Sequence, residues 1–155
     1  MMIRRRDLPH EEASMQLAAK LAHCLIAGIV VTFRGEIGTG KTTFIRAMLR
    51  ALGVTSAVKS PTFSLVESYQ CQSLQIHHFD LYRIQDEEEL EYIGFRDYFG
   101  SGAVCCLEWP ERAPNSLINV DLRFTLSMNG SGRLMTIEAL SAAGETILTC
   151  LAGIE

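Results

Sequence analysis

The chain contains a phosphate-binding loop, or P-loop, pattern, G-x-x-x-x-G-K-[ST], in the run Gly35-Glu36-Ile37-Gly38-Thr39-Gly40-Lys41-Thr42-Thr43. The glycines let the backbone turn tightly, so that successive N–H groups point inward at phosphate oxygens. In such a loop Lys41 reaches the β- and γ-phosphates, and Thr42 offers its hydroxyl to Mg²⁺. A helix that begins here also directs the positive end of its dipole at the anion. The whole run is therefore expected to line a nucleoside triphosphate.

The segments on either side of the run suit this interpretation. Residues 29–33 form a short, apolar, β-branched stretch, which is typical of a buried strand, and it ends where the loop begins. After the loop, apolar residues recur at helical spacing up to Gly53, which is a natural helix end. This strand, loop and helix predict an α/β fold of the P-loop NTPase type.

Further strands are predicted on the C-terminal side. Residues 63–69 and 74–80 indicate two strands joined by a short polar turn, and such a hairpin implies a mixed sheet rather than a parallel one. Residues 103–107 are continuously apolar, as expected of a central strand. Residues 122–126 and 134–139 alternate around a turn at 129–132 and predict a second hairpin.

Helices are expected to flank this sheet. Residues 11–26 have the apolar spacing of an amphipathic helix. Asp86, with Glu89 three residues later, reads as the cap of another helix rather than as part of an acidic binding patch. A further short helix is expected at 95–99. With 155 residues, of which 48% are hydrophobic and 21% charged, the chain suits a single domain over residues 1–155.

Two acids at predicted strand ends are candidates for the chemistry. Mg²⁺ at a P-loop requires a carboxylate opposite the loop hydroxyl, and Glu108 follows the central strand at 103–107. Asp80 ends the strand at 74–80 and would position a water, accept a proton or support the metal. The alternative for each acid is a surface salt bridge. His77 and His78 would either join Asp80 in a metal site or, as we favour, contact neighbours in the hairpin.

Composition limits the remaining options. The net charge of −4 argues against a chain that grips nucleic acid by itself. The cluster Arg4-Arg5-Arg6 is followed by acids rather than by an apolar segment, so it does not predict a targeting signal, and no stretch is long enough to span a membrane. The five cysteines are odd in number and lack C-x-x-C spacing, so all five are expected to be thiols, without a disulfide or zinc site. A cytoplasmic location is expected.

Several stretches together resemble one known family, TsaE, also called YjeE. They occur in the family's order and spacing over about residues 10–112, and they are the P-loop run, Val58-Lys59-Ser60-Pro61-Thr62-Phe63, His78-Phe79-Asp80-Leu81-Tyr82-Arg83, Glu88-Glu89-Leu90 and Glu108-Trp109-Pro110. The sequences S-P-T-F, H-F-D-L-Y-R and E-W-P are not general features of P-loop proteins. The family is a small bacterial ATPase required, with TsaB, TsaD and TsaC, to make threonylcarbamoyladenosine in tRNA beside the anticodon.

The resemblance implies roles for single residues. Lys41 and Thr42 match the residues that bind phosphate and Mg²⁺, and Glu108 matches a second magnesium ligand. Asp80 corresponds to an acid that the family needs for activity. Thr62 lies where the family has a switch-like threonine near the γ-phosphate.

Three more residues are implied near the site. Trp109 corresponds to the family's tryptophan beside the nucleotide, with simple packing as the alternative. Arg133 is similar to a position near the nucleotide, and Arg83 would contact phosphate or a partner. Residues 113–118 lack the Leu-Pro pair usual after E-W-P, so the resemblance does not define that loop.

The sequence thus predicts a P-loop domain that binds Mg²⁺ and ATP and hydrolyses ATP slowly. The resemblance implies that it acts with the TsaB–TsaD complex, that contact with tRNA is indirect or weak, and that the isolated chain is a monomer. One alternative is a small-molecule kinase, suggested by His78-Phe79-Asp80, although the chain is short and shows no lid. A nucleotide-gated interaction module with negligible catalysis is another. A GTPase is disfavoured because no N-K-x-D sequence is present.

Overall fold

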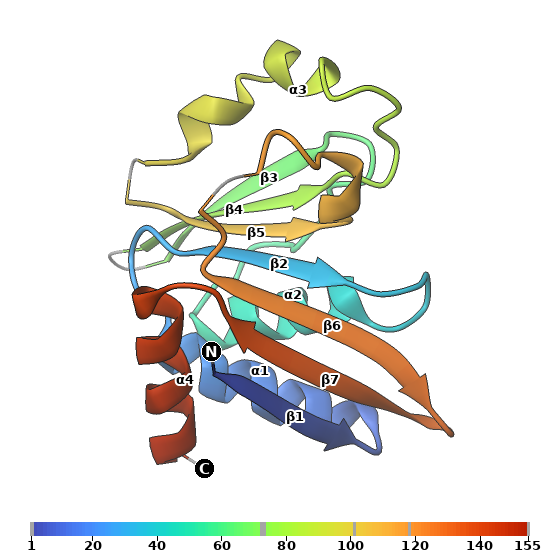
Figure 1. Ribbon diagram of the computed structural model, residues 1–155, viewed down its shortest axis with the longest axis vertical. Coiled ribbons are helices and arrows are strands. Elements are labelled where there is room, and N and C mark those ends of the chain that lie inside the picture. Colours follow the sequence, from blue (N-terminus) through green and yellow to red (C-terminus); the bar gives the residue numbers. More distant parts are fainter. Residues whose placement is uncertain (1, 72–73, 101, 118, 155) are drawn as a thin grey trace.

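The computed structural model describes residues 2–71, 74–100, 102–117 and 119–154. They form one seven-stranded sheet in the order β1-β7-β6-β2-β5-β4-β3 (Figure 1). The strands are β1 (Ile3–Leu8), β2 (Val30–Arg34), β3 (Val66–Cys71), β4 (Leu74–Asp80), β5 (Val104–Glu108), β6 (Leu122–Asn129) and β7 (Gly132–Ala139). The helices are α1 (Glu11–Cys24), α2 (Lys41–Ala51), α3 (Glu89–Tyr92), η1 (Phe95–Tyr98), η2 (Pro110–Arg112) and α4 (Ala142–Ile154).

The sheet is mixed, as the sequence predicts. Its central strands β4, β5, β2 and β6 are parallel, whereas β3, β7 and β1 pair antiparallel with their neighbours. Both predicted hairpins are present, and the turn of the first, residues 72 and 73, lies outside the described residues. The parallel strands place their carboxyl ends, and therefore Asp80 and Glu108, at the same edge of the sheet.

Helices α1, α2 and α4 cover one face of the sheet (Figure 1). Their apolar side chains pack on alternate residues of the strands, such as Val31 and Phe33 of β2. Three rings form the centre of this core, because Phe33 lies 5.9 Å from Phe44 and 4.9 Å from Phe124 between centroids. Phe44 belongs to the first turn of α2, so this cluster supports the beginning of that helix.

The opposite face of β2, β5 and β4 is covered by α3, η1 and the segment after β5. Its core is aromatic: the Phe79 ring lies 5.1 Å from Phe95 and 5.2 Å from Tyr98, and Phe95 lies 4.8 Å from Phe99. The expected cap lies two residues early, because α3 begins at Glu89 and its N-cap is Glu88. Asp86 belongs to the turn before the helix, where its carboxylate accepts from Glu88 N–H at 2.9 Å and its own N–H donates to Glu89 Oε2.

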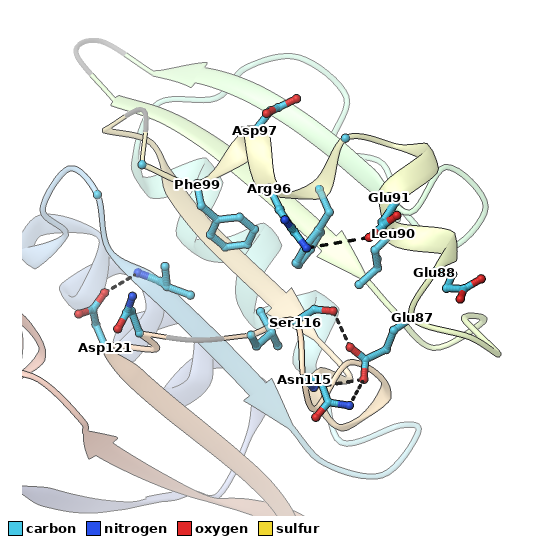
Figure 2. A pocket seen from close by; sticks show the side chains of 17 residues that line it. Glu87, Glu88, Leu90, Glu91, Arg96, Asp97, Phe99, Asn115, Ser116 and Asp121 are labelled. Atoms are coloured by element: carbon cyan, nitrogen blue, oxygen red, sulfur yellow. Dashed lines mark hydrogen bonds and ion pairs between the residues drawn. The ribbon is translucent and has the colours of Figure 1, made fainter.

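A cavity of about 1110 Å³ lies beneath this second covering layer (Figure 2). Glu87 closes one side of it, because its carboxylate accepts hydrogen bonds from Asn115 N–H at 3.1 Å and from the Ser116 hydroxyl. The Ser116 hydrogen bond lowers the pKa of the Glu87 carboxyl. At the other side Asp121 accepts from the backbone N–H of Val30 at 2.8 Å.

Three elements were not predicted from the sequence, namely β1, η2 and α4. The Arg4-Arg5-Arg6 cluster lies in edge strand β1, where alternate residues are exposed. Helix α4 begins after Ser141, whose hydroxyl oxygen accepts a hydrogen bond from Gly144 N at 3.0 Å. Gly144 is required there because a Cβ would lie 2.1 Å from the carbonyl oxygen of Asp121.

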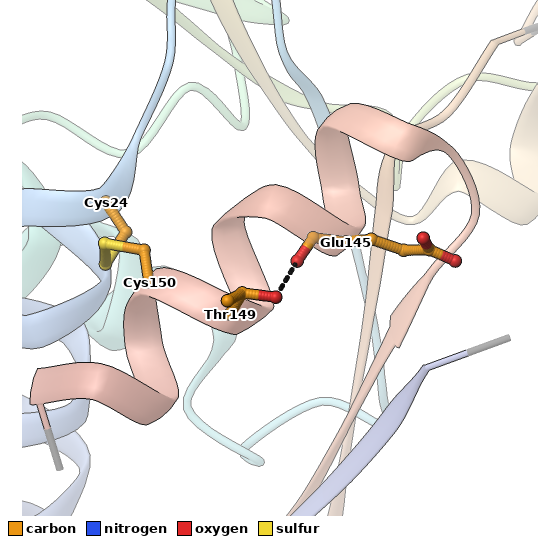
Figure 3. Close-up of a disulfide and its surroundings, with 4 residues drawn as sticks. All are labelled: Cys24, Glu145, Thr149 and Cys150. Carbon is orange, nitrogen blue, oxygen red and sulfur yellow. Dashed lines mark hydrogen bonds between the residues drawn. A yellow bond between two sulfur atoms is a disulfide. The ribbon is translucent and has the colours of Figure 1, made fainter.

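The expectation that all five cysteines are thiols is wrong for one pair. Cys24, at the end of α1, forms a disulfide with Cys150 of α4 (Figure 3). The two residues are 126 positions apart in the sequence, so no local cysteine spacing could have predicted the bond. Cys71, Cys105 and Cys106 are free and buried, and burial raises the pKa of the Cys105 thiol to about 12.

Among the described residues, every helix is too short or too polar to cross a bilayer.

Candidate nucleotide site

The P-loop connects β2 to α2 in the way the sequence predicts. Gly38 and Gly40 have φ angles of +86° and +96°, a conformation that favours glycine, and Gly40 is the N-cap of α2. Gly35 is held against the neighbouring strand, because a Cβ there would lie 2.6 Å from the carbonyl oxygen of Leu126. The loop backbone therefore depends on glycine at all three positions.

Arg133 of β7 braces the outside of this loop. Its guanidinium donates to the carbonyl oxygens of Thr39 at 3.1 Å and Gly38 at 3.0 Å. A carbonyl that points outward turns the N–H of the same peptide unit to the opposite side. Arg133 thus contacts the P-loop backbone, and the N–H groups of Thr39 and Gly40 are turned away from it.

Lys41 lies at the inner side of the loop. Only 5% of the residue is exposed, and its ammonium donates to the carbonyl oxygens of Gly35 and Glu36. It also lies 4.1 Å from the centroid of the Trp109 ring. Burial lowers the pKa of Lys41, while Glu108 and other nearby carboxylates act in the opposite direction.

Thr42 and Glu108 meet across the gap between α2 and β5. The Thr42 hydroxyl lies 2.8 Å from Glu108 Oε1 and 2.9 Å from Oε2. Glu108 is also 2.7 Å from Nε2 of His78, on the neighbouring strand β4. The carboxylate that the sequence assigns to Mg²⁺ is therefore beside the P-loop hydroxyl, and it is only 2% exposed.

Asp80 is the register partner of Glu108 on β4. Its carboxylate accepts hydrogen bonds from the Thr62 hydroxyl at 3.1 Å and from Tyr82 N–H at 3.1 Å. Burial raises the pKa of the Asp80 carboxyl, and the charge of Glu108 adds to this, whereas the hydrogen bonds from Tyr82 and Thr62 oppose it. The Asp80 carboxylate therefore binds a proton more tightly than a surface aspartate does.

The loop before β3 connects Thr62 to this acid. The hydroxyl oxygens of Ser60 and Thr62 are 2.8 Å apart, and the backbone N–H of Asp80 donates to the carbonyl oxygen of Leu65. Phe63, at the tip of the loop, is 85% exposed and contacts the guanidinium of Arg83, which lies 4.7 Å from its ring centroid. Arg83 does not line the cavity beside the P-loop.

Trp109 follows Glu108 in the left-handed region, with a φ of +59°, which is uncommon for a bulky residue. Its ring centroid lies 4.9 Å from that of Tyr82. Both rings line the cavity of the site, so Trp109 contributes a wall as well as a cation–π contact to Lys41.

These residues enclose a cavity of about 360 Å³. Of the residues predicted for the site, those that line it are Glu36, Ile37, Gly38, Gly40, Lys41, Thr42, Thr43, Thr62, Asp80, Glu108 and Trp109. Gly35 and Thr39 belong to the loop but do not line the cavity, and Arg133 supports the loop from outside. Sequence reasoning missed Tyr82 and the contact of His78 with Glu108. The signal for His78 was available, since it lies two residues before Asp80 and alternate residues of a strand share a face.

Oxygen donors from Thr42 and Glu108 suit Mg²⁺, which takes few protein ligands and leaves the others to water and phosphate. No cluster of three histidine, cysteine or acidic side chains that would hold a metal by itself occurs in the described part of the chain. The donor set therefore fits a metal bound together with a nucleotide rather than an independent metal centre.

Comparison with known proteins identifies the family. Residues 8–135 match the family model for threonylcarbamoyl adenosine biosynthesis protein TsaE. The chain belongs to the TsaE family. The tRNA threonylcarbamoyladenosine biosynthesis protein TsaE of Haemophilus influenzae is 36% identical over 147 residues, covering 92% of this chain and 93% of that protein. TsaE of Aquifex aeolicus is 40% identical over 107 residues, covering 68% and 75%.

The fold comparison agrees with the TsaE assignment. The crystal structure of YdiB from Bacillus subtilis has a TM-score of 0.85 and 25% sequence identity, and covers 99% of this chain and 96% of that one. The resemblance drawn from the sequence motifs is thus confirmed, as is the α/β fold of the P-loop NTPase type. The TsaE family takes part in threonylcarbamoyladenosine biosynthesis.

Proposed function

We propose that this chain, acting as one domain, binds Mg²⁺ and ATP at the P-loop cavity and hydrolyses ATP slowly. Its biological use would be to drive or reset the TsaB–TsaD complex during threonylcarbamoyladenosine modification of tRNA in the cytoplasm. The observation that supports this most directly is the 2.8 Å hydrogen bond between the Thr42 hydroxyl and Glu108, beside the buried Lys41. It joins the two halves of a P-loop site that lie 66 residues apart in the sequence.

The roles follow from the positions. The P-loop N–H groups and Lys41 bind the phosphates, and Thr42 and Glu108 would hold Mg²⁺. When bound, the metal neutralises charge that develops on the transferred phosphoryl group. Asp80 orients the attacking water or receives its proton, and Thr62, through its hydrogen bond to Asp80, connects this acid to the loop near the γ-phosphate. Trp109 bounds the space beside the nucleotide.

Slow hydrolysis is proposed because no arginine lines the cavity among the described residues. An arginine that contacts the γ-phosphate is worth about 10³- to 10⁵-fold in rate. Three arginines around the site already have contacts, since Arg83 lies over Phe63, Arg112 lies 5.5 Å from the Tyr82 ring centroid and Arg133 donates to P-loop carbonyl oxygens. A partner that supplies or repositions such a group would complete the site, and the isolated chain is proposed to be a weakly active monomer.

Direct binding of tRNA is proposed to be weak or absent. The chain carries a net charge of −4, whereas phosphate neutralisation requires a basic surface. The TsaB–TsaD complex, rather than this chain, would then hold the tRNA.

The test combines phosphate release with nucleotide titration. Lys41→Ala and Thr42→Ala should lower ATP hydrolysis by at least about 10²-fold, because each removes a group that stabilises the reacting phosphates or the metal. Lys20→Ala, on α1, is the matched control and should hydrolyse ATP at the unmodified rate. Adding an excess of TsaB–TsaD to the unmodified chain should raise its turnover.

Undiminished hydrolysis in Lys41→Ala would refute the P-loop assignment. A rate that partners leave unchanged would show that the site is complete by itself. Phosphate transfer to an added small molecule, in place of release, would indicate a kinase, and nucleotide binding without either reaction would indicate a nucleotide-gated interaction module.

A further inference from the structure

His78 occupies an unusual place beside the proposed metal ligand. Its side chain is only 1% exposed, and its Nε2 lies 2.7 Å from Oε2 of Glu108, whose side chain is 3% exposed. In the parallel register of β4 and β5, Asp80 lies opposite Glu108 and His78 lies opposite Cys106. Alternate residues of a strand share a face, so the side chains of His78 and Glu108 lie on the same face of the sheet. Burying a histidine and a carboxylate together costs free energy, because both groups lose their hydration, and the hydrogen bond between them must offset that cost.

The other ring nitrogen indicates which tautomer is present. Nδ1 of His78 is buried and has no hydrogen-bond partner among the described residues. A proton must lie between Nε2 and Glu108 Oε2, because two lone pairs would repel each other at 2.7 Å. A second proton on Nδ1 would leave a charged donor buried without an acceptor, which is more costly than a bare lone pair. His78 therefore donates from Nε2 and leaves Nδ1 unprotonated.

This donation determines what the rest of Glu108 contacts. The Thr42 hydroxyl has one proton and lies within hydrogen-bond distance of both carboxylate oxygens. With Oε2 already bound to His78, Oε1 is the better acceptor for that proton. A Thr42 hydroxyl that donates to Oε1 keeps its lone pairs available on the side of the P-loop cavity, where a metal would bind.

We propose that His78 is a positioning residue of the magnesium–nucleotide site, which orients Glu108 by donating Nε2–H to Oε2 and thereby aims the Thr42 hydroxyl oxygen at the metal. This inference rests on the proposed function. It adds a second layer to the metal site, in which a ligand is held by a histidine that does not itself touch the metal.

The neighbouring residue provides a matched control. His77 is also buried, at 5% exposed, but it faces the opposite side of the sheet. Its Nδ1 lies 2.7 Å from the Ser68 hydroxyl, and its ring lies 4.7 Å from Tyr98. Replacing either histidine removes a side-chain hydrogen bond from the same strand, but of the two only His78 contacts Glu108.

The experiment compares His78→Phe, His78→Gln and His77→Phe. Mn²⁺ affinity is measured by electron paramagnetic resonance in the presence of a non-hydrolysable ATP analogue, and affinity for the analogue alone is measured in EDTA. His78→Phe should weaken Mn²⁺ binding about 10- to 100-fold and leave metal-free nucleotide binding unchanged, as expected for the loss of a group that holds a metal ligand. His78→Gln retains a donor and should recover most of the affinity, and His77→Phe should match the unmodified chain.

Two results would overturn the inference while leaving the proposed function standing: unchanged Mn²⁺ affinity in His78→Phe, or an equal loss in His77→Phe. Nucleotide binding by the unmodified chain that ignores the metal would overturn both. If His78→Phe does not fold, the ¹⁵N chemical shifts of the unmodified chain decide. A protonated Nε2 with a bare Nδ1 supports the inference, and a protonated Nδ1 refutes it.

Discussion

The two faces of the central sheet share the strands β2, β5 and β4 but differ in what covers them. One face lies under the regular helices α1, α2 and α4, and the other lies under the short helices α3 and η1 and an irregular segment. The site side chains of β4 and β5 all belong to the first face. The difference shows that the same strands serve two purposes, because one face carries the site side chains beside α2 and the other face only packs against its covering layer.

Alternation along β4 makes this division visible. His78 and Asp80 point to the site, whereas Phe79 between them packs in the aromatic cluster with Phe95 and Tyr98. A shift of one residue in the register of β4 would exchange these roles. The site therefore depends on the register of β4 as well as on the presence of its acidic residues, because the register decides which side chains face the site.

The largest effects are expected when one buried phenylalanine from each face is replaced by alanine. Phe44→Ala and Phe95→Ala each remove a ring that is 1% or 3% exposed, so each should lower the free energy of unfolding by about 3–5 kcal/mol. Only Phe44→Ala should also impair the site, by up to about 10²-fold in ATP turnover, because it leaves a cavity under the first turn of α2. Urea unfolding and hydrolysis assays measure the two quantities separately.

An equal loss of turnover in Phe95→Ala would mean that the face covered by α3 and η1 also controls the site. Phe44→Leu and Phe95→Leu are milder controls that keep part of each ring's volume in case an alanine variant does not fold.

A smaller effect is expected from a change within the helical face, at the disulfide between α1 and α4. Cys150→Ser removes the disulfide between α4 and α1, and it should lower the free energy of unfolding by about 2–4 kcal/mol while leaving ATP affinity unchanged. The reason is that α4 packs on α1 and β7, whereas the proposed site is built on α2 and the edge of β4 and β5. Addition of a reductant should lower the stability of the unmodified chain to that of Cys150→Ser. A change in ATP affinity on reduction would show that the whole helical face is coupled to the site.

The smallest expected effect concerns the charge on Asp80. Burial raises the pKa of this carboxyl above its ordinary value of 3.8, so the folded state binds the proton more tightly than the unfolded state does. The stability that this provides is present below the ordinary pKa and is lost as the pH rises through the raised pKa. Asp80→Asn cannot ionise, so it should be more stable than the unmodified chain above this window, and the difference should shrink in acid.

Urea unfolding at a series of pH values tests this prediction. Lower stability of Asp80→Asn at neutral pH would mean that the hydrogen bonds from Thr62 and Tyr82 outweigh the burial of the charge. The same variant should hydrolyse ATP more slowly while its nucleotide affinity changes less, since Asp80 is proposed to act in the reaction rather than in binding.

Local patterns were enough to predict the P-loop, its flanking strand and helix, and the strands that end in Asp80 and Glu108. Strand β1 was not predictable in this way, because its exposed and half-buried arginines do not form an apolar pattern. Helix α4 contains two glycines, and Gly144 is there to allow close contact with Asp121, which only the folded chain reveals.

Long-range geometry accounts for what the sequence could not provide at the site. The contact between His78 and Glu108 depends on the register of β4 against β5, and the contact of Arg133 with the P-loop depends on the β7 hairpin. Each joins segments that are far apart in the chain, by 30 residues in the first case and by 94 or more in the second. Periodicity reports only on neighbours, so such contacts remain invisible until the sheet order is known.

The bond between Cys24 and Cys150 closes the covalent chain into a ring that contains six of the seven strands, the P-loop and both acids. Only β1, α1 and the last few residues lie outside it. A protease that cuts one exposed connection within the ring would therefore leave the two parts of the molecule on a single covalent thread. Such a nicked molecule would run as one species on a denaturing gel until a reductant released its pieces, so the gel with and without reductant reports directly on whether the bond between Cys24 and Cys150 has formed.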